Sequence, residues 1–557
     1  MAISNRELNT IEVVVKGKGS YQTVSGITLG AFYDQLRDEL EYPAVAGIID
    51  NHLRDVYFPL DQDCEIELVD LSSDMGLKTY RRSVVFLMIK ASWDLFPGRK
   101  LMIKHSLSNG LYCEFLDRAS TAQEIEMISR RMEELVAQDL PINRILVDRE
   151  VARQLFTDQD QDDTVEILEY RNKSKVHVYE LDGFYEYFYA YMVSSTGLLK
   201  KFKLLNYAPG MILQTPEIND LKLEQPFREL PQLFKVYQEA KAWANMLNTS
   251  HLAAMNKIIA AGEIDDLIRV NEALQEKKIA QIADMICNDP KTRLVLIAGP
   301  SSSGKTSFAQ RLLIQLRVNG RHPVSISLDN YFVDKIKTPR DEDGDYDFEA
   351  LEALKLDLFN DHLTRLIRGE EVEIPIYDFR QGRCLSKGVP ITVPAGEPII
   401  IEGIHGLNDQ LTWSIPAEQK FKIYVSALTM LNIDYTNRIP TTDCRLIRRI
   451  VRDRRTRGYS ALETIKRWPS VRRGEERNIF PFQENADIMF NTSLLFEMSA
   501  LKPFAEPLLR EIGPENPEHA EARRLLKFLS YFRPIPSTNI PPNSILREFV
   551  GGSWFKV

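Results

Sequence analysis

The spacing of apolar and polar residues changes along the chain and divides it into regions. Residues 11–15 are mostly β-branched, residues 27–36 carry apolar positions at helical spacing, and residues 64–68 alternate between polar and apolar. This mixture of periods predicts a small, β-rich α+β unit over residues 1–70.

Residues 71–225 mix the two periods again. A helix is predicted over residues 80–96, where a proline-glycine pair stops it, and residues 175–179 and 198–205 are strand-like. We therefore expect a second α+β domain here.

Residues 226–288 are rich in Ala, Lys and Glu, and their apolar residues recur at helical spacing. The pattern predicts a helical connector. The apolar positions that carry it include Leu267, Val270, Leu274, Ile279 and Ile282.

Residues 294–298 form a wholly apolar run followed by glycine, which is typical of a strand buried on both faces of a parallel sheet. Strand and helix patterns then alternate to about residue 510, so an α/β domain is predicted over residues 289–510. Proline pairs near residues 533–542 predict an extended tail or cover over residues 511–557.

Composition and charge narrow the classes of function. Net charge is −9, from 70 Lys+Arg against 79 Asp+Glu, so no overall field attracts nucleic acid or anionic lipid. The five cysteines form no C-x-x-C pair, which fits a reducing compartment. No apolar run approaches the ~20 residues of a membrane span, and the N-terminus lacks the apolar core of a signal peptide. We expect a cytoplasmic protein with no membrane contact.

The strongest chemical signal is the sequence GPSSSGKT at residues 299–306, a G-x-x-x-x-G-K-[ST] phosphate loop between the predicted strand and a helical segment. Its backbone N–H groups and the helix N-terminus would face the phosphates of ATP, Lys305 would reach the β and γ oxygens, and Thr306 would bind Mg²⁺. The alternative is a glycine-rich turn without a ligand. The predicted ATP-binding residues are Gly299, Ser301, Ser302, Ser303, Gly304, Lys305, Thr306 and Ser307.

Two predicted strands end in carboxylates, where ligands bind in open α/β folds. Asp329 follows the strand at residues 324–328, and could accept the proton of a substrate hydroxyl; a helix N-cap is the alternative. Glu402 ends the strand at residues 399–402, and could hold Mg²⁺ directly or through water. Acids are also common at strand ends without a ligand.

Arginines recur at i, i+3, i+4 and i+7 on one predicted helix face. In a kinase they would form a lid that neutralises the transferring phosphoryl group. A solvated face paired to nearby acids and an RNA-binding stripe are the alternatives. The four are Arg445, Arg448, Arg449 and Arg452, with Arg454, Arg455 and Arg457 just beyond.

In combination, the phosphate loop, the sequence LDNYF at residues 328–332, PIYDF at residues 375–379 and RRIVRD at residues 448–453 resemble the uridine kinase and phosphoribulokinase family. The resemblance covers about residues 290–510. It implies a P-loop kinase with ATP and Mg²⁺, in which Asp329 is the base toward a nucleoside 5′-hydroxyl. It also implies that Tyr346 stacks on the base, Asp347 binds the ribose, Tyr377 and Phe379 form the nucleobase wall, and Arg449, Arg452 and Arg457 form the lid.

Two stretches depart from that pattern and bear on the acceptor. Residues 380–383 read RQGR where pyrimidine nucleoside kinases usually place a base-reading histidine, and residues 466–475 are richer in cations than a nucleoside requires. An extra phosphate or acid on the acceptor would explain the cations. Uridine or cytidine is the first expectation, and a phosphorylated sugar or another small alcohol is the alternative.

The N-terminal half resembles the front end of threonyl-tRNA synthetases: residues 1–70 a TGS domain, which is a ubiquitin-like β-grasp module, and residues 71–225 the editing domain. The family's H-x-x-x-H helix and downstream C-x-x-x-H bind a metal. Here these positions fall on Arg82, Phe86, Phe188 and Met192, which are not zinc ligands. We predict that the fold is retained and the editing chemistry lost.

The complete prediction is a multidomain α/β kinase with a P-loop parallel-sheet domain preceded by β-grasp and editing-like domains. Its partners would be ATP and a small acceptor, and the resemblance allows a homo-oligomer. A rival from another class is an RNA-associated regulator, in which ATP binding controls an RNA-contacting N-terminal half.

Overall fold

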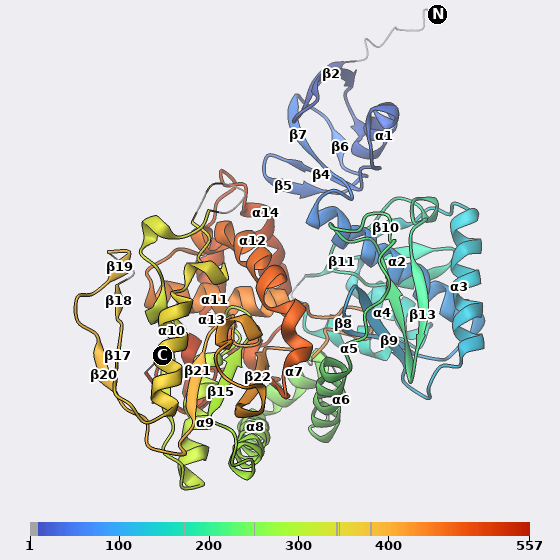
Figure 1. The fold of residues 1–557 in the computed structure, drawn as a ribbon. Helices are drawn as coiled ribbons and strands as arrows, with labels where there is room; N and C mark the ends of the chain where they lie inside the picture. The colour runs from blue at the N-terminus through green and yellow to red at the C-terminus, as the bar shows by residue number, and fades with distance from the viewer. Residues whose placement is uncertain are drawn as a thin grey trace, which may run out of the picture.

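The structure, a computed structural model, describes residues 9–171, 173–249, 251–340, 344, 346–378, 381–429 and 431–556. A small N-terminal unit lies above two larger bodies, and the larger of these holds the C-terminal half of the chain (Figure 1). None of the helices in the described ranges is long and apolar enough to cross a bilayer.

The N-terminal unit is a mixed sheet with strand order β2-β1-β7-β4-β5 and one helix packed on it. Alternate residues of β1 (Ile11, Val13 and Val15) are buried in one core with Phe32 of α1, as the period-two pattern predicts. The sheet and helix confirm the small α+β unit. Its elements are β1 (Thr10–Val15), β2 (Gly19–Val24), β3 (Ile27–Thr28), α1 (Leu29–Gln35), β4 (Ala46–Ile49), β5 (His52–Arg54), β6 (Pro59–Leu60) and β7 (Cys64–Val69).

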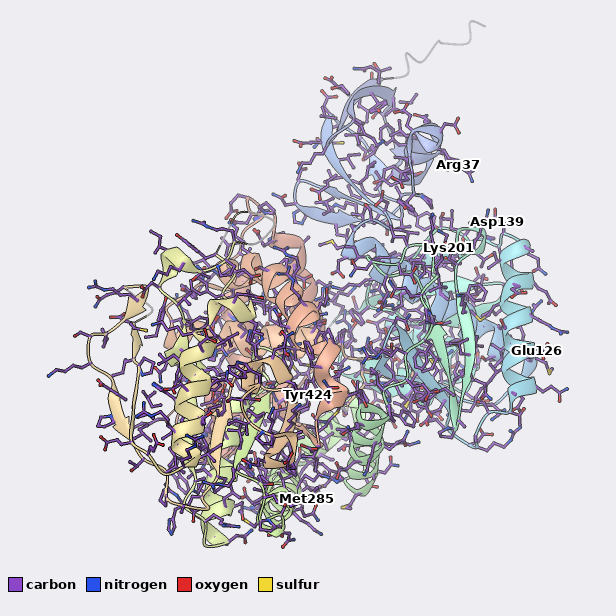
Figure 2. All side chains as sticks on the ribbon, viewed as in Figure 1. Arg37, Glu126, Asp139, Lys201, Met285 and Tyr424 are labelled. Carbon is purple, nitrogen blue, oxygen red and sulfur yellow. The ribbon has the colours of Figure 1, made fainter. Side chains whose placement is uncertain are left out.

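The second unit contains two antiparallel sheets, of orders β13-β14-β9-β8 and β10-β11-β12, packed with helices (Figure 1). Helix α2 begins six residues before the predicted start, because the Ser73 side chain caps it by accepting the Gly76 N–H. Glu126 lies on the outer side of α3 (Figure 2). The elements are α2 (Asp74–Leu95), β8 (Leu101–Leu107), β9 (Gly110–Phe115), α3 (Ala122–Ala137), β10 (Asn143–Asp148), α4 (Arg149–Thr157), α5 (Asp162–Glu169), β11 (Lys175–Leu181), β12 (Phe184–Glu186), β13 (Lys203–Tyr207) and β14 (Gly210–Gln214).

The connector is helical, as predicted: α6 (Pro231–Met246), α7 (Leu252–Ala261) and α8 (Ile264–Asn288). Helix α8 packs along the first helix of the C-terminal domain, where Arg311 pairs with Glu272 and Glu276. The connector is therefore part of the C-terminal body and not a free linker.

The C-terminal domain is built on a five-stranded parallel sheet of order β16-β21-β15-β22-β23. Every residue of the central strand β15 is buried, and Tyr424 of β22 lies in the interior (Figure 2). The predicted α/β fold is confirmed. The main elements are β15 (Leu294–Ala298), α9 (Lys305–Val318), β16 (Val324–Ser327), α10 (Leu356–Ile367), β21 (Ile399–Glu402), β22 (Lys420–Ser426), α11 (Thr441–Thr456), α12 (Ala461–Asn478), β23 (Ile488–Asn491) and α13 (Glu497–Arg510). Two short hairpins lie outside the main sheet: β17 (Val372–Ile374) with β20 (Val389–Ile391), and β18 (Tyr377–Asp378) with β19 (Arg383–Cys384).

The C-terminal segment differs from the extended tail that its prolines predict. It forms α14 (His519–Leu529) and the short α15 (Arg547–Val550), and the prolines occupy the stretch between them. Leu525, Phe528 and Phe549 are fully buried in the main core, because apolar residues at helical spacing outweigh the proline signal outside residues 533–542. The segment is thus an integral layer of the domain.

Three carboxyl groups are buried where the second unit meets the C-terminal domain. Asp163, Glu186 and Asp434 are 4%, 2% and 0% exposed, and the Asp163 carboxyl accepts the Tyr435 N–H at 2.6 Å. Desolvation, assisted by repulsion from Asp434, raises the pKa of Asp163 to about 7, and desolvation likewise raises the pKa of Glu186. The junction therefore favours protonated carboxyl groups.

Asp163→Asn is expected to flatten the pH dependence of stability. The folded protein holds this proton more tightly, so its contribution is fully present below the unfolded pKa of about 3.9 and is lost as the pH rises through about 7. The variant should gain resistance to urea at pH 8 and not at pH 4, as followed by circular dichroism. The control is Asp162→Asn, which removes the exposed partner of Lys100. Equal gains at both pH values would contradict this origin.

Candidate functional site

The phosphate loop joins the central strand β15 to α9, and its backbone requires the glycines that the motif supplies. Gly304 is the N-cap of α9 with φ of +82°, in the left-handed region. A Cβ on Gly299 would lie 1.9 Å from the Val425 carbonyl oxygen of the neighbouring strand. Ser302 also has a positive φ, of +58°. The predicted strand-loop-helix context is present.

Lys305 and Thr306 open α9 and face the end of β21. The Lys305 Nζ donates to the carbonyl oxygens of Gly299 and Pro300, at 2.9 and 3.2 Å. Desolvation lowers the pKa of Lys305, and the carboxylates of Glu402 and Glu548 oppose that shift. The ammonium group of this half-buried side chain is therefore held over the loop, where a phosphate oxygen would compete for it.

Thr306 and Glu402 fit a Mg²⁺ ion. The Thr306 hydroxyl donates to Glu402 Oε1 at 2.9 Å, so two oxygen ligands of the kind Mg²⁺ prefers are already together. Desolvation raises the pKa of Glu402 to about 7. A cation bound beside this carboxyl group would stabilise its ionised form. No cluster of three or more His, Cys, Asp or Glu suited to a metal occurs among the described residues. The protein would supply few ligands itself, as is usual for Mg²⁺ on nucleotide phosphates.

Asp329 lies just past β16, at the same edge of the sheet. Part of its side chain is exposed to solvent, but neighbouring protein atoms desolvate the carboxyl group. This desolvation raises the pKa of Asp329, while the positive charges of Lys305 and Arg457 lower it. Its charge also raises the pKa of Glu402, so the two carboxylates share one site. Ser327, and not Asp329, caps the following 3₁₀ turn by accepting the Asp329 N–H at 3.3 Å. Asp329 is therefore left available for another role.

The arginines of α11 divide into two groups, which corrects their prediction as one lid face. Arg445 and Arg448 are 1% and 0% exposed, and they pair with the buried carboxylates of Glu475 and Glu497. Arg445 also donates to the Ser301 carbonyl at 3.0 Å. Buried arginines need carboxylate partners, so these two brace the phosphate loop and do not reach a ligand.

The three arginines assigned to the lid gather around Asp453. Arg449 and Arg452 lie 3.2 and 2.8 Å from its carboxylate and Arg457 lies 3.8 Å from it. The Arg449 NH1 also donates to the Ser301 hydroxyl at 2.8 Å, so it touches the loop directly. Of these three arginines, only Arg457 is largely exposed. These arginines therefore do not form a fully solvated helix face.

The residues assigned to the acceptor carry cationic partners. The Arg340 guanidinium lies 3.7 Å from the ring centroid of Tyr346, and Asp347 accepts from Arg477 at 2.9 Å. Tyr377 is buried with its ring 5.6 Å from that of Phe332. Phe379 lies outside the described residues.

Sequence reasoning missed two carboxylates that already occupy donors of the loop. Glu475 accepts the Ser301 N–H at 2.9 Å. Glu548 of α15 accepts both the N–H and the hydroxyl of Ser307, at 3.3 and 2.9 Å. Glu548 lies 241 residues from Ser307 in sequence, so no local pattern could have placed it there.

Glu548→Gln is expected to tighten ATP binding by about tenfold, or about 1.4 kcal/mol. The Ser307 N–H is the last amide at the start of α9 without a partner inside the helix, since the Phe308 N–H bonds to the Gly304 carbonyl. The carboxylate that accepts this N–H repels an incoming phosphate. Glutamine keeps an oxygen for Ser307 and removes the charge. Equilibrium binding of a fluorescent ATP analogue measures the effect, with Glu511→Gln, on the exposed start of the same segment, as control. Unchanged or weaker binding would show that Glu548 does not oppose the phosphates.

At the degenerate editing positions the side chains pack together. The rings of Phe86 and Phe188 lie 5.6 Å apart, edge to face, and Met192 is buried in the same core. The Arg82 guanidinium donates to the Tyr191 carbonyl at 2.6 Å. These contacts are those of a packed core. The loss of editing chemistry remains a prediction.

Comparison with known proteins finds a different similarity for each half of the chain. Residues 294–495 match the Phosphoribulokinase / Uridine kinase family. The N-terminal part is similar to threonine–tRNA ligases: that of Halorhodospira halophila is 32% identical over 184 residues, which are 33% of this chain and 29% of the ligase. The chain thus spans less than a third of the length of the curated relatives it matches.

Solved structures of kinases are also similar to this chain. A possible uridine kinase from Bacillus stearothermophilus is 18% identical with a TM-score of 0.24, and the match covers 36% of this chain and 89% of that one. A D-glycerate 3-kinase from Cryptococcus neoformans is 14% identical with a TM-score of 0.21, over 46% of this chain and 93% of that one. The match of residues 294–495 to the family supports a P-loop kinase of a small substrate.

Proposed function

We propose that the protein transfers the γ-phosphoryl group of ATP to the 5′-hydroxyl of a nucleoside, with uridine or cytidine as the first candidate. The observation that carries the proposal is the meeting of Asp329, Lys305 and the Thr306–Glu402 pair at the carboxyl edge of one parallel sheet. A base, a phosphate-binding cation and a magnesium site are the parts that direct phosphoryl transfer needs.

In this mechanism the acceptor oxygen forms a bond to the γ-phosphorus while the bond to the β–γ bridging oxygen breaks, which releases ADP. Asp329 orients the acceptor hydroxyl and takes its proton. Lys305 and the loop N–H groups hold the β and γ oxygens, and Arg449, Arg452 and Arg457 neutralise charge on the transferring group. Mg²⁺, which Thr306 and Glu402 would hold, supplies further charge neutralisation.

A second acceptor class is favoured by the cations around Tyr346 and Asp347. Arg340 covers one face of the Tyr346 ring, the Lys335 ammonium lies 5.3 Å from the ring centroid, and Arg477 pairs with Asp347. A nucleoside carries no charge that would use these groups, whereas a phosphorylated sugar does. The second proposal is therefore a kinase of a phosphorylated sugar or similar small alcohol.

The test is ATP consumption by the purified full chain with Mg²⁺, across uridine, cytidine, purine nucleosides and sugar phosphates. Turnover on uridine or cytidine supports the first proposal, and turnover on a sugar phosphate alone supports the second. Arg340→Met should then lower activity on the sugar phosphate and leave nucleosides unaffected. Silence on every acceptor would contradict both and favour the RNA-associated regulator.

A further inference from the structure

A cluster of cations lies where the second unit meets the end of α14. Its members come from separate elements: Arg144 from β10, Arg171 and Lys173 from the stretch before β11, and Lys527 from α14. The Arg171 NH1 donates to the Ser530 hydroxyl at 2.9 Å, which ties the end of α14 to this place. We call these four residues the cationic recess.

Lys527 is the centre of the recess. Its side chain is exposed to solvent, and among the described residues its ammonium group has no hydrogen-bond or ion-pair partner. Its strongest electrostatic neighbours are all cations: Arg171, Arg144, Lys173 and Arg82. Desolvation is the main cause that lowers the pKa of Lys527, to about 7, and repulsion from these cations adds to it. Nearby cations disfavour the charged form of this lysine, and an anion bound beside them would favour it.

Arg171 gives a second, independent indication. The side chain is 7% exposed and stacks over the Tyr531 ring at 4.7 Å, yet its Nε is buried without a hydrogen-bond partner. Buried polar groups are nearly always paired, so an orphaned guanidinium donor beside an unpaired lysine points to a missing acceptor.

The carboxylates near the cationic recess already form ion pairs with arginines. Asp55 pairs with Arg144, and Asp443 and Glu521 both pair with Arg524, one turn before Lys527 on α14. His177, on β11, is held neutral by the same cations: after desolvation, Arg144 and Lys527 lower the pKa of His177, to about 4. Of the four cations, Arg144 is therefore compensated by Asp55, and the recess as a whole carries net positive charge.

We propose that the cationic recess is a binding site for a phosphate group, separate from the kinase site. Phosphate offers the several acceptor oxygens and the charge that a guanidinium fork and an ammonium group recognise together. The group could belong to a small phosphorylated molecule or to the backbone of a nucleic acid, since both present the same oxygens. Because the recess joins the second unit to α14, its ligand would also hold these two parts together.

The experiment follows Lys527 itself. Reductive ¹³C-methylation of the full chain gives an NMR signal for each lysine, and Lys527→Met assigns the one of interest. Titration with inorganic pyrophosphate, and separately with a ten-nucleotide single-stranded RNA, should shift this signal and raise its titration midpoint by one unit or more. Calorimetry at pH 8 should show proton uptake on binding, which a purely structural lysine would not produce.

The outcomes separate the sources of the phosphate. Binding of RNA that weakens steeply with salt, with little response to pyrophosphate, assigns a nucleic acid, and the reverse assigns a small phosphorylated ligand. Lys527→Met should weaken binding at least tenfold, whereas Lys222→Met, on the loop before α6, should not. The proposal is overturned if neither probe moves the Lys527 signal, or if Lys527→Met and Lys222→Met bind alike. Pyrophosphate in the phosphate loop cannot imitate a response at Lys527.

Discussion

Asp329→Asn is expected to lower turnover by about 100-fold or more while ATP affinity stays within about twofold. Asparagine keeps the size and hydrogen-bonding oxygen of the side chain but cannot accept the proton of the acceptor hydroxyl. ATP binding should survive, because the loop N–H groups, Lys305 and the Thr306–Glu402 pair are untouched. Steady-state kinetics together with equilibrium ATP binding measures both quantities on one preparation.

The pH profile adds an independent check on the same residue. Desolvation raises the pKa of Asp329, so wild-type turnover should climb with pH as this carboxyl ionises and becomes a base. The residual activity of Asp329→Asn should lack that limb. Asp361→Asn removes an exposed carboxylate that pairs with Arg365 on α10, and it should behave like wild type. Wild-type turnover by Asp329→Asn would remove the base from the mechanism.

The parts of the site that the sequence predicts are those with a local pattern. The phosphate loop is a continuous motif between a buried strand and a helix, and Asp329 and Glu402 each end an apolar run. Parallel strands bring their carboxyl ends to one edge, so the fold itself joins residues that are 73 positions apart, as the β16–β21 register shows.

Residues that depend on distant contacts could not be predicted in this way. The pattern of α11 puts Arg445, Arg448 and Arg449 on neighbouring positions, but only tertiary packing separates them. Glu475 and Glu497 take the first two inward, while Arg449 reaches the Ser301 hydroxyl. Helical periodicity reports which residues share a face, and not which carboxylate lies opposite.

Glu548 shows the same limit at the loop itself. Prolines dominate the local signal of the C-terminal segment, whereas its docking depends on burial of Ile545 and Phe549 against elements far away in sequence. An ideal Cβ on Gly304 would lie 2.6 Å from the Ile545 side chain, so the motif glycine also makes room for this segment. Part of the loop's glycine requirement thus comes from a neighbour that the motif does not mention.

Lys305→Met is expected to weaken ATP binding about tenfold and to lower turnover about 100-fold to 1,000-fold. Methionine keeps the unbranched aliphatic stem and removes the charge, so the packing above the loop is preserved. The loss in turnover exceeds the loss in affinity, because negative charge on the β and γ oxygens grows during transfer and the ammonium group stabilises the transition state more than bound ATP.

Comparing the two variants tests whether Asp329 and Lys305 have different roles in the site. Asp329→Asn should change turnover alone, whereas Lys305→Met should change both turnover and ATP affinity. Removing Lys305 also removes the strongest positive charge acting on Glu402, whose pKa should then rise further above about 7 and make Mg²⁺ dependence steeper at low pH. Lys337→Met, on the exposed turn after β16, is the control. If Lys305→Met retained wild-type affinity and turnover, the loop at residues 299–306 would not be the phosphate site.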